Sequence, residues 1–228
     1  MMKKLLTLLL LQTALCGIIL SQKTYVPDDN FENYLETHDA AGNTVPLGDP
    51  TSMGDGIANN DSVLTFNISS VTNLNVSSQS IADLTGIADF TVLDTLNCGS
   101  NQLASLDVSN NTALTYLSCM DNQLTSLDVT GLSSLTGLHC QNNQIDSLDV
   151  SGFTGLTQFD FSNNPLTSFN ISGCTGLTGI INVDGGLPGG PDLTNLQVSG
   201  CSNITHLYCS SNSLTDLDPA GCTSLQEI

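Results

Sequence analysis

The sequence contains no tryptophan, no arginine and only three lysines, against 22 acidic residues in 228 positions. Nucleic-acid binding depends on Lys and Arg that displace the counterions of the phosphates, so this balance argues against a nucleic-acid partner. The same lack of cations argues against docking on an anionic membrane surface. Because charged residues make up only 11% of the chain, the polar surface has to come from Asn, Ser, Thr and Gly.

Long apolar runs are also missing, except at the N-terminus. Two lysines precede an apolar stretch that starts at Leu5, and the small Ser21 offers a cleavage point. This pattern predicts a secretory signal peptide over residues 1–21. An N-terminal membrane anchor is disfavoured because Gln12 and Thr13 interrupt a stretch already shorter than the about 20 apolar residues of a span. We therefore expect a secreted or cell-surface protein without a transmembrane segment in its mature chain.

A repeat of 21 residues organises most of the sequence. One unit reads L-T-Y-L-S-C-M-D-N-Q-L-T-S-L-D-V-T-G-L-S-S from Leu114, and the next reads L-T-G-L-H-C-Q-N-N-Q-I-D-S-L-D-V-S-G-F-T-G from Leu135. Units start near residues 71, 93, 114, 135, 156, 177, 204 and 225. The first is degenerate, the unit at 177 is stretched by a G-G-L-P-G-G-P segment, and the last is only an opening. The solenoid is predicted over residues 71–228.

The shared pattern L-x-x-L-x-C-x-x-N-x-L is the signature of leucine-rich repeats. With its L-D-V-S element, the chain resembles the bacterial secreted leucine-rich-repeat proteins of the short 21-residue class. The resemblance covers roughly two thirds of the chain. It implies adhesion and protein–protein interaction as family tendencies, and proteins of this kind often continue into further repeats and a sorting module.

The repeat predicts a mainly β solenoid with short parallel strands on its concave face. Alternation such as Leu114, Leu117 and Cys119 turns apolar side chains inward, and each unit relies on its neighbours to complete a core. One asparagine recurs at the turn that leaves each strand, where its amide can satisfy backbone groups of two coils. This structural column comprises Asn101, Asn122, Asn143, Asn164 and Asn212. Leu106–Val108 and its equivalents are expected to return as a second short extended segment.

Residues 22–70 are predicted to form an N-terminal cap, because the open end of a solenoid exposes apolar surface. Pro27-Asp28-Asp29-Asn30 is typical of a helix start, and Phe31, Tyr34 and Leu35 share one face of the expected helix. The Gly-, Asp- and Asn-rich stretch 48–61 is expected to be an irregular loop. No cap follows Ile228, so we expect a C-terminally incomplete fragment of a longer product; a natural stop with capping by a partner is the alternative.

Seven of the eight cysteines follow the predicted leader. A secreted chain with this many cysteines invites a disulfide interpretation. The cysteines, however, occupy inward repeat positions that other units fill with hydrophobic residues, and buried free Cys behaves as a small hydrophobe. The first position holds Cys98, Cys119, Cys140 and Cys209, and the second holds Cys174, Cys201 and Cys222. We expect reduced core thiols, and the C-x-x-C spacing of structural zinc sites is absent.

The acidic residues suggest either turn chemistry or calcium. Asp107, Asp128, Asp149 and Asp218 form one column, which Asn170 and Gln197 continue. Asp commonly accepts local backbone N–H groups in turns, and this interpretation is favoured because no D-x-D-x-D-G loop is present. A second weak calcium candidate is the loop with Asp49, Asp55 and Asp61. No metal site is predicted from ligand spacing.

Outward side chains of the predicted strands form the candidate binding surface. They are Thr95, Asn97, Tyr116, Ser118, His139, Gln158, Asp160, His206 and Tyr208. The rings among them are the expected anchors of recognition. The alternative is a solvated, Thr-rich sheet face, since Thr is favoured on strands in any case.

Catalysis finds no support in the sequence. His38, His139 and His206 lie in different parts of the chain, and neither a G-x-S-x-G elbow nor a phosphate-cradling glycine loop is present. We therefore expect no enzyme and no cofactor, but a recognition or adhesion module that binds protein or glycan through the concave face. A structural surface coat, or the substrate-presenting part of a longer enzyme, are the alternatives.

Overall fold

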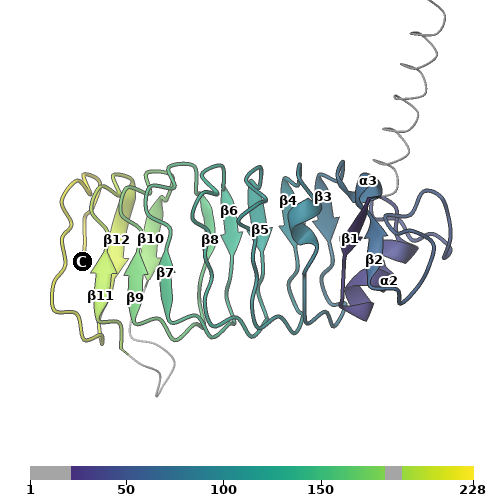
Figure 1. The fold of residues 1–228 in the computed structure, drawn as a ribbon. Coiled ribbons are helices and arrows are strands. Elements are labelled where there is room, and N and C mark those ends of the chain that lie inside the picture. Colours follow the sequence, from purple (N-terminus) through teal and green to yellow (C-terminus); the bar gives the residue numbers. More distant parts are fainter. Residues whose placement is uncertain (1–21, 183–191) are drawn as a thin grey trace, which may run out of the picture.

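The computed structural model describes residues 22–182 and 192–228. The predicted signal peptide and the G-G-L-P-G-G-P segment of residues 185–191 lie outside the described residues. Successive repeats wind about one axis as an elongated solenoid, with the helical cap at the purple end of the chain (Figure 1). The predicted fold class, a mainly β solenoid of short parallel strands with a small N-terminal helix, is confirmed.

The first sheet is built from the opening strand of five successive units. Its strands are β3 (Asn73–Asn75), β4 (Thr95–Asn97), β5 (Tyr116–Ser118), β6 (Gly137–His139) and β8 (Gln158–Asp160), parallel and in that order. Equivalent residues pair across the ladder, so that Leu96 lies beside Leu117 and Leu117 beside Leu138. These three leucines are fully buried. The alternation of the repeat therefore places one side of each strand in the core, as the sequence predicts.

The sheet is interrupted after β8. The next opening strand, β10 (Gly179–Asn182), pairs with β12 (Ile204–Tyr208) in a separate two-stranded sheet, and no ladder joins β8 to β10 among the described strands. Gly179 has a φ of 82°, and the register shifts between Gly179 and Ile180. The stretched unit at 177 therefore starts a new sheet instead of extending the first.

A second sheet forms on the return path of three units. It contains β7 (Ser147–Asp149), β9 (Ser168–Asn170) and β11 (Asn195–Gln197), parallel and in the order β11-β9-β7. The expectation of a second short extended segment is confirmed in these units. The equivalent residues 106–108 and 127–129 form no ladder, so the second sheet is confined to the later units.

The N-terminal part covers one end of the solenoid. It contains the antiparallel pair β1 (Lys23–Tyr25) and β2 (Ser62–Leu64), helix α2 (Asp29–Thr37) and the short helix α3 (Thr65–Ile68), and the 3-10 helix η1 (Ile87–Asp89) follows in the first unit. Asp28 joins α2 to that unit. One of its oxygens accepts from Asn30 N and Phe31 N at 3.0 Å each, and the other accepts from Ala82 N at 2.8 Å and Asp83 N at 3.1 Å. A single carboxylate thus caps the helix and fixes it to the repeats.

One continuous apolar core runs through the described chain, from Val26 beside α2 to Cys222 in the last full unit. Phe31, Tyr34 and Leu35 of α2 belong to it, as the helical spacing predicts. In the unit at 156, the partly buried Phe159 and Phe161 pack against the core residue Phe169, with ring centroids 4.5 Å apart for Phe161 and Phe169. Among the described residues, no helix is long and apolar enough to cross a membrane.

The asparagine column holds neighbouring coils together at the turn that leaves each strand. Nδ2 of Asn143 donates to the carbonyls of Cys140 in its own coil and Cys119 in the preceding one, at 3.0 Å each, and Oδ1 accepts from Leu124 N at 3.0 Å. Asn101, Asn122 and Asn164 make the equivalent bonds, and Asn212 bonds to Cys209 O and Leu193 N. The residue just before each has a left-handed φ of 54–57°, which Asp and Asn adopt more readily than most residues.

The cysteines line the core in the two predicted columns. Cys98, Cys119 and Cys140 are fully buried in consecutive coils, whereas Cys209 is only half-buried. In the second column the thiols of Cys174, Cys201 and Cys222 each donate to a main-chain carbonyl of a preceding coil, at 2.9–3.1 Å. Burial raises the pKa of the Cys98 thiol to about 12. Thiols held neutral in this way act as small apolar core residues.

Replacing Asn143 by Ala should destabilise the protein by about 2–4 kcal/mol, because buried carbonyls and an amide N–H of two coils lose their partner. Asn110→Ala provides the matched control, since Asn110 is exposed in a turn, and its effect should stay within about 0.5 kcal/mol. Urea unfolding followed by far-UV circular dichroism measures both. Equal midpoints for the two variants would contradict the role given to the column.

The buried thiols should make stability fall with rising pH. Burial raises the folded-state pKa of five thiols above the unfolded value of about 8.5, so their contribution is complete below that pH and is lost as the pH rises through the raised values; they are Cys98, Cys119, Cys140, Cys174 and Cys201. The urea midpoint should therefore decrease between pH 8 and pH 10.5, and less so in Cys98→Ala.

Alkylation in urea without reductant, read by mass spectrometry, checks the redox state: fewer than seven modified cysteines after removal of residues 1–21 would contradict reduced thiols.

Candidate functional site

The outward side chains of β3, β4, β5, β6 and β8 form one continuous surface, here called the strand face. It carries seven of the sequence-predicted contact residues, namely Thr95, Asn97, Tyr116, Ser118, His139, Gln158 and Asp160. Main-chain pairing puts Asn97, Ser118, His139 and Asp160 in one row across four strands. The neighbouring row contains Thr95, Tyr116, Gly137 and Gln158.

Tyr116 and His139 form the aromatic centre of the strand face. Their ring centroids are 5.4 Å apart, with 39° between the planes. The Tyr116 ring extends over the neighbouring strand at Gly137, where a Cβ atom would lie only 2.6 Å from its Cδ2. Gly137 is itself buried. The missing side chain at position 137 therefore creates the space that the tyrosine ring occupies.

Ser118 lies on this face but is not accessible. It is only 3% exposed, so the expectation that it contributes to a contact surface needs correction. Its short side chain sits in the row between Asn97 and His139, whose longer side chains leave it little access to solvent. The strand pattern correctly indicates an outward direction, but direction alone does not decide exposure.

His206 and Tyr208 do not join the strand face. Both belong to β12 in the separate two-stranded sheet, with ring centroids 6.1 Å apart. His206 Nδ1 lies 2.9 Å from Thr205 Oγ1, and its Nε2 lies 3.9 Å from a carboxylate oxygen of Glu227. The interruption after β8 thus divides the nine predicted contact residues into a group of seven and a pair.

The aspartate column serves the turns of the return path. Oδ1 of Asp107, Asp128, Asp149 and Asp218 accepts a backbone N–H from two residues further on, at 2.8–3.0 Å. Hydrogen bonds from Ser109 hold the pKa of Asp107 below its ordinary value, and those from Thr130 do the same for Asp128. These contacts agree with the turn interpretation of the column.

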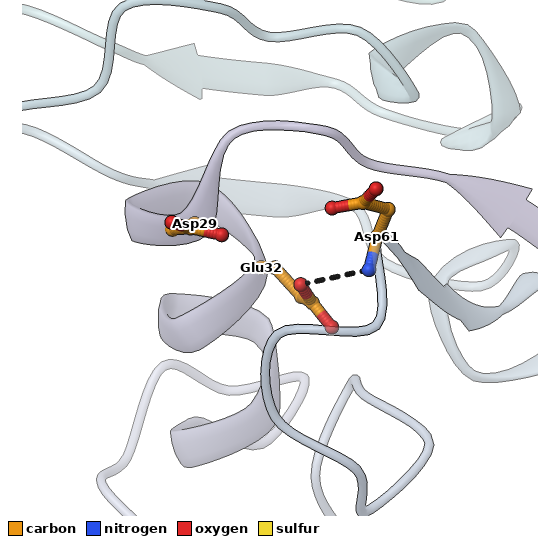
Figure 2. Close-up of side chains that lie close together, drawn as sticks. All are labelled: Asp29, Glu32 and Asp61. Atoms are coloured by element: carbon orange, nitrogen blue, oxygen red, sulfur yellow. Dashed lines mark hydrogen bonds between the residues drawn. The ribbon is translucent and has the colours of Figure 1, made fainter.

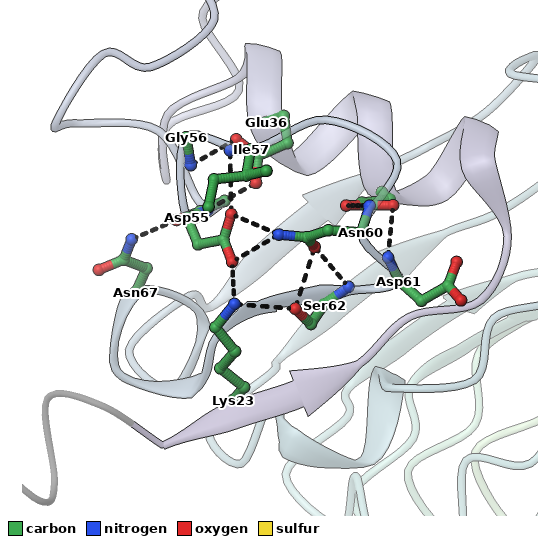
Figure 3. A network of polar contacts seen from close by, with 11 residues as sticks. Lys23, Glu36, Asp55, Gly56, Ile57, Asn60, Asp61, Ser62 and Asn67 are labelled. Carbon is green, nitrogen blue, oxygen red and sulfur yellow. Dashed lines mark hydrogen bonds and ion pairs between the residues drawn. The ribbon is translucent and has the colours of Figure 1, made fainter.

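The acidic loop of the cap does not assemble the second candidate calcium site. Asp55 Oδ2 lies 2.7 Å from Lys23 Nζ (Figure 3). Asp49, by contrast, bonds to Thr51 within its own turn. Burial opposes ionisation of Asp55, but hydrogen bonds from Lys23 and Asn60 outweigh it and lower its pKa. The ammonium group of Lys23 therefore occupies the place beside Asp55 that the calcium hypothesis gives to a cation.

Two buried glutamates of α2 hold this loop. Glu36 accepts from Asp55 N and Gly56 N at 2.6 and 2.8 Å, and burial raises its pKa. Glu32 accepts from Asn60 N and Asp61 N at 3.0 and 3.1 Å. Two backbone N–H groups thus replace the water molecules that each carboxylate loses on burial.

One carboxylate oxygen from each of Asp29, Glu32 and Asp61 lies within 4.8 Å of the other two (Figure 2). Sequence analysis missed this cluster because its members are separated by the loop, although the i, i+3 spacing of Asp29 and Glu32 on α2 places those two on one side. Hard oxygen ligands suit calcium. Both oxygens of Glu32 already accept backbone N–H groups of the loop. Glu32 therefore has a structural role in this cluster.

The comparisons with known proteins agree with the repeat. Residues 62–164 match the family model described as the leucine-rich-repeat domain of the endo-β-N-acetylglucosaminidase EndoS, and residues 203–225 match the general leucine-rich-repeat model. A search of curated proteins returned no match.

Two solved structures from Listeria monocytogenes illustrate the likeness. The functional domain of InlJ, which includes a cysteine ladder, is 33% identical over 91% of this chain, with a TM-score of 0.65. This chain spans only 42% of that structure. An internalin C2 is 18% identical over 91% of this chain and 97% of its own, with a TM-score of 0.49. By its repeat, its solenoid and the matched models, this chain belongs to the leucine-rich-repeat proteins, with repeats of 21 residues.

Proposed function

We propose that this chain is a secreted or cell-surface recognition and adhesion module that binds a protein or glycan ligand through the strand face. The observation that carries this function is the ring of Tyr116, which extends over Gly137 beside His139 on a surface otherwise made of small polar side chains. Rings held in place by their surroundings lose little conformational freedom on binding, and for that reason they often anchor recognition.

The surroundings of the ring pair suit a polar ligand. Asn97 and Asp160 are half-buried in the row that contains His139, and Gln158 is exposed beside Gly137. Their amide and carboxylate groups offer hydrogen bonds around an apolar centre, which is the usual composition of a binding surface. Ser118 has no direct contact role in this proposal, because it lies beneath the surface.

Secretion rests on the predicted signal peptide over residues 1–21, and the cap at 22–70 and solenoid at 71–228 complete the proposed organisation. The net charge of −19 disfavours nucleic acid and anionic lipid as ligands. Calcium has no part in the proposed binding.

The substrate-presenting part of a longer enzyme is the second candidate. It is favoured by the match of residues 62–164 to the leucine-rich-repeat domain of an endo-β-N-acetylglucosaminidase. That match is to the repeat domain of such an enzyme and supports glycans as the ligand class. A surface coat without a ligand has no comparable observation in its favour.

A screen of the chain from residue 22 onward against glycan arrays and matrix proteins identifies a ligand, and variants then test the face. The double variant Tyr116→Ala/His139→Ala should bind about tenfold more weakly or worse, since central aromatic anchors commonly contribute 2 kcal/mol or more. Asn110→Ala should bind as the parent chain does. Unchanged affinity of the double variant would overturn the strand face as the binding surface.

Gly137→Ala should reduce ligand binding while leaving every aromatic residue in place. Its new Cβ displaces the Tyr116 ring, and the backbone at Gly137 has no left-handed φ that an alanine would strain. Gly155→Ala is the matched control, because a Cβ there makes only ordinary contacts. Affinity is measured by calorimetry and folding by the urea midpoint. Equal affinity for the two variants would contradict the role of the ring position.

A further inference from the structure

The second sheet ends at β11, and the outer edge of this strand carries no partner strand among the described residues. On its inner edge, Asn195 N donates to Thr167 O at 3.2 Å and Gln197 O accepts from Ile171 N at 2.9 Å. Backbone groups of successive residues in a parallel ladder point to alternate sides. The N–H and C=O of Leu196 therefore point outward, away from β9, while its side chain stays in the core.

The segment that would cover this edge in the next unit does not pair with it in the described structure. Ser213 N is bonded to Leu193 O at 3.0 Å, and Gly200 N is bonded to Ala220 O at 2.7 Å. Between these two fixed points, residues 216–218 form no backbone hydrogen bond to β11 in the described structure. Instead, the carboxylate of Asp216 accepts from Leu217 N at 2.9 Å. The ladder therefore stays open over the length of β11.

A cavity of about 270 Å³ lies at this edge. Its lining consists of Ser172, the run of residues 195–199, and the two carboxylates Asp216 and Asp218. Both aspartates are exposed. The cavity thus combines an open strand edge on one side with negative charge on the other.

We propose that this cavity is a docking site for an extended basic peptide segment of a partner protein, which adds to β11 as a further strand. Strand addition satisfies the outward backbone groups at Leu196, and lysine or arginine side chains of the incoming strand meet Asp216 and Asp218. The occupant comes from another protein. Lys23 is the only lysine or arginine in the described residues and is paired with Asp55, and a second copy of this acidic chain repels the first.

The site is independent of the strand face, because β11 belongs to a different sheet. Loss of binding at the strand face leaves this proposal untouched, and the reverse also holds.

The test uses a fluorescein-labelled tetrapeptide of alternating lysine and valine, short enough to lie between the Leu193–Ser213 and Gly200–Ala220 bonds, titrated with the chain from residue 22 onward. Asp216→Asn/Asp218→Asn should weaken binding about tenfold, because two charges are removed while an amide oxygen still accepts Leu217 N and Ala220 N. Asp107→Asn/Asp128→Asn removes equal charge from column positions away from the cavity and should leave the affinity within about twofold. Hydrogen exchange should show new protection of the Leu196 amide.

Backbone pairing is tested with two peptides that are N-methylated at alternate positions. An added strand pairs with β11 through only one of its two edges, so only every second backbone N–H of the peptide takes part. Methyl groups on those nitrogens should abolish binding, and methyl groups on the other nitrogens should be tolerated. Equal weakening by both aspartate pairs would reduce the effect to non-specific charge attraction and overturn the site. Equal binding of the two methylated peptides, an unprotected Leu196 amide, or dimerisation of the chain through this edge would also overturn it.

Discussion

In five units of the described solenoid, one asparagine satisfies buried main-chain carbonyls and amides at the turn that leaves the strand. The same side chain bonds to its own coil and to the preceding one, as Asn143 does with Cys140 and Cys119. A buried polar group without a partner costs free energy comparable to a lost hydrogen bond. The period of 21 residues is therefore held in place by this bond, and the inward leucines and cysteines follow its spacing. Where the unit at 177 departs from the period, the first sheet ends.

Small residues decide what the outer surface offers. Gly137 gives the Tyr116 ring a place on the neighbouring strand, and Ser118 lies hidden between longer side chains in the next row. On a parallel sheet with side chains about 4.8 Å apart, the size of each neighbour decides how much of a side chain reaches solvent. The character of the strand face thus depends on pairs of residues that are a whole repeat apart in the sequence.

The acidic residues have separate local tasks in spite of the large net charge. Asp107 and its equivalents accept turn amides, Asp28 joins α2 to the first unit, and Glu32 and Glu36 hold the loop of the cap. Only Asp55 meets the ammonium group of Lys23. Hydrogen bonds from backbone N–H groups stabilise a carboxylate without any cation, so a chain with so few lysines can still bury part of its negative charge.

The sequence by itself determined the repeat, the inward positions, the asparagine column and helix α2, because each of these depends on spacing within one unit or between identical units. Only the tertiary structure decided that His206 and Tyr208 leave the strand face, that Ser118 is covered, and that Asp29, Glu32 and Asp61 come together. The tertiary structure alone also shows that the outer edge of β11 carries no partner strand among the described residues. These features depend on the register between unlike units and on the volume of neighbours across coils. A local pattern of polar and apolar residues contains neither quantity, since it describes the direction of a side chain and not what lies beside it.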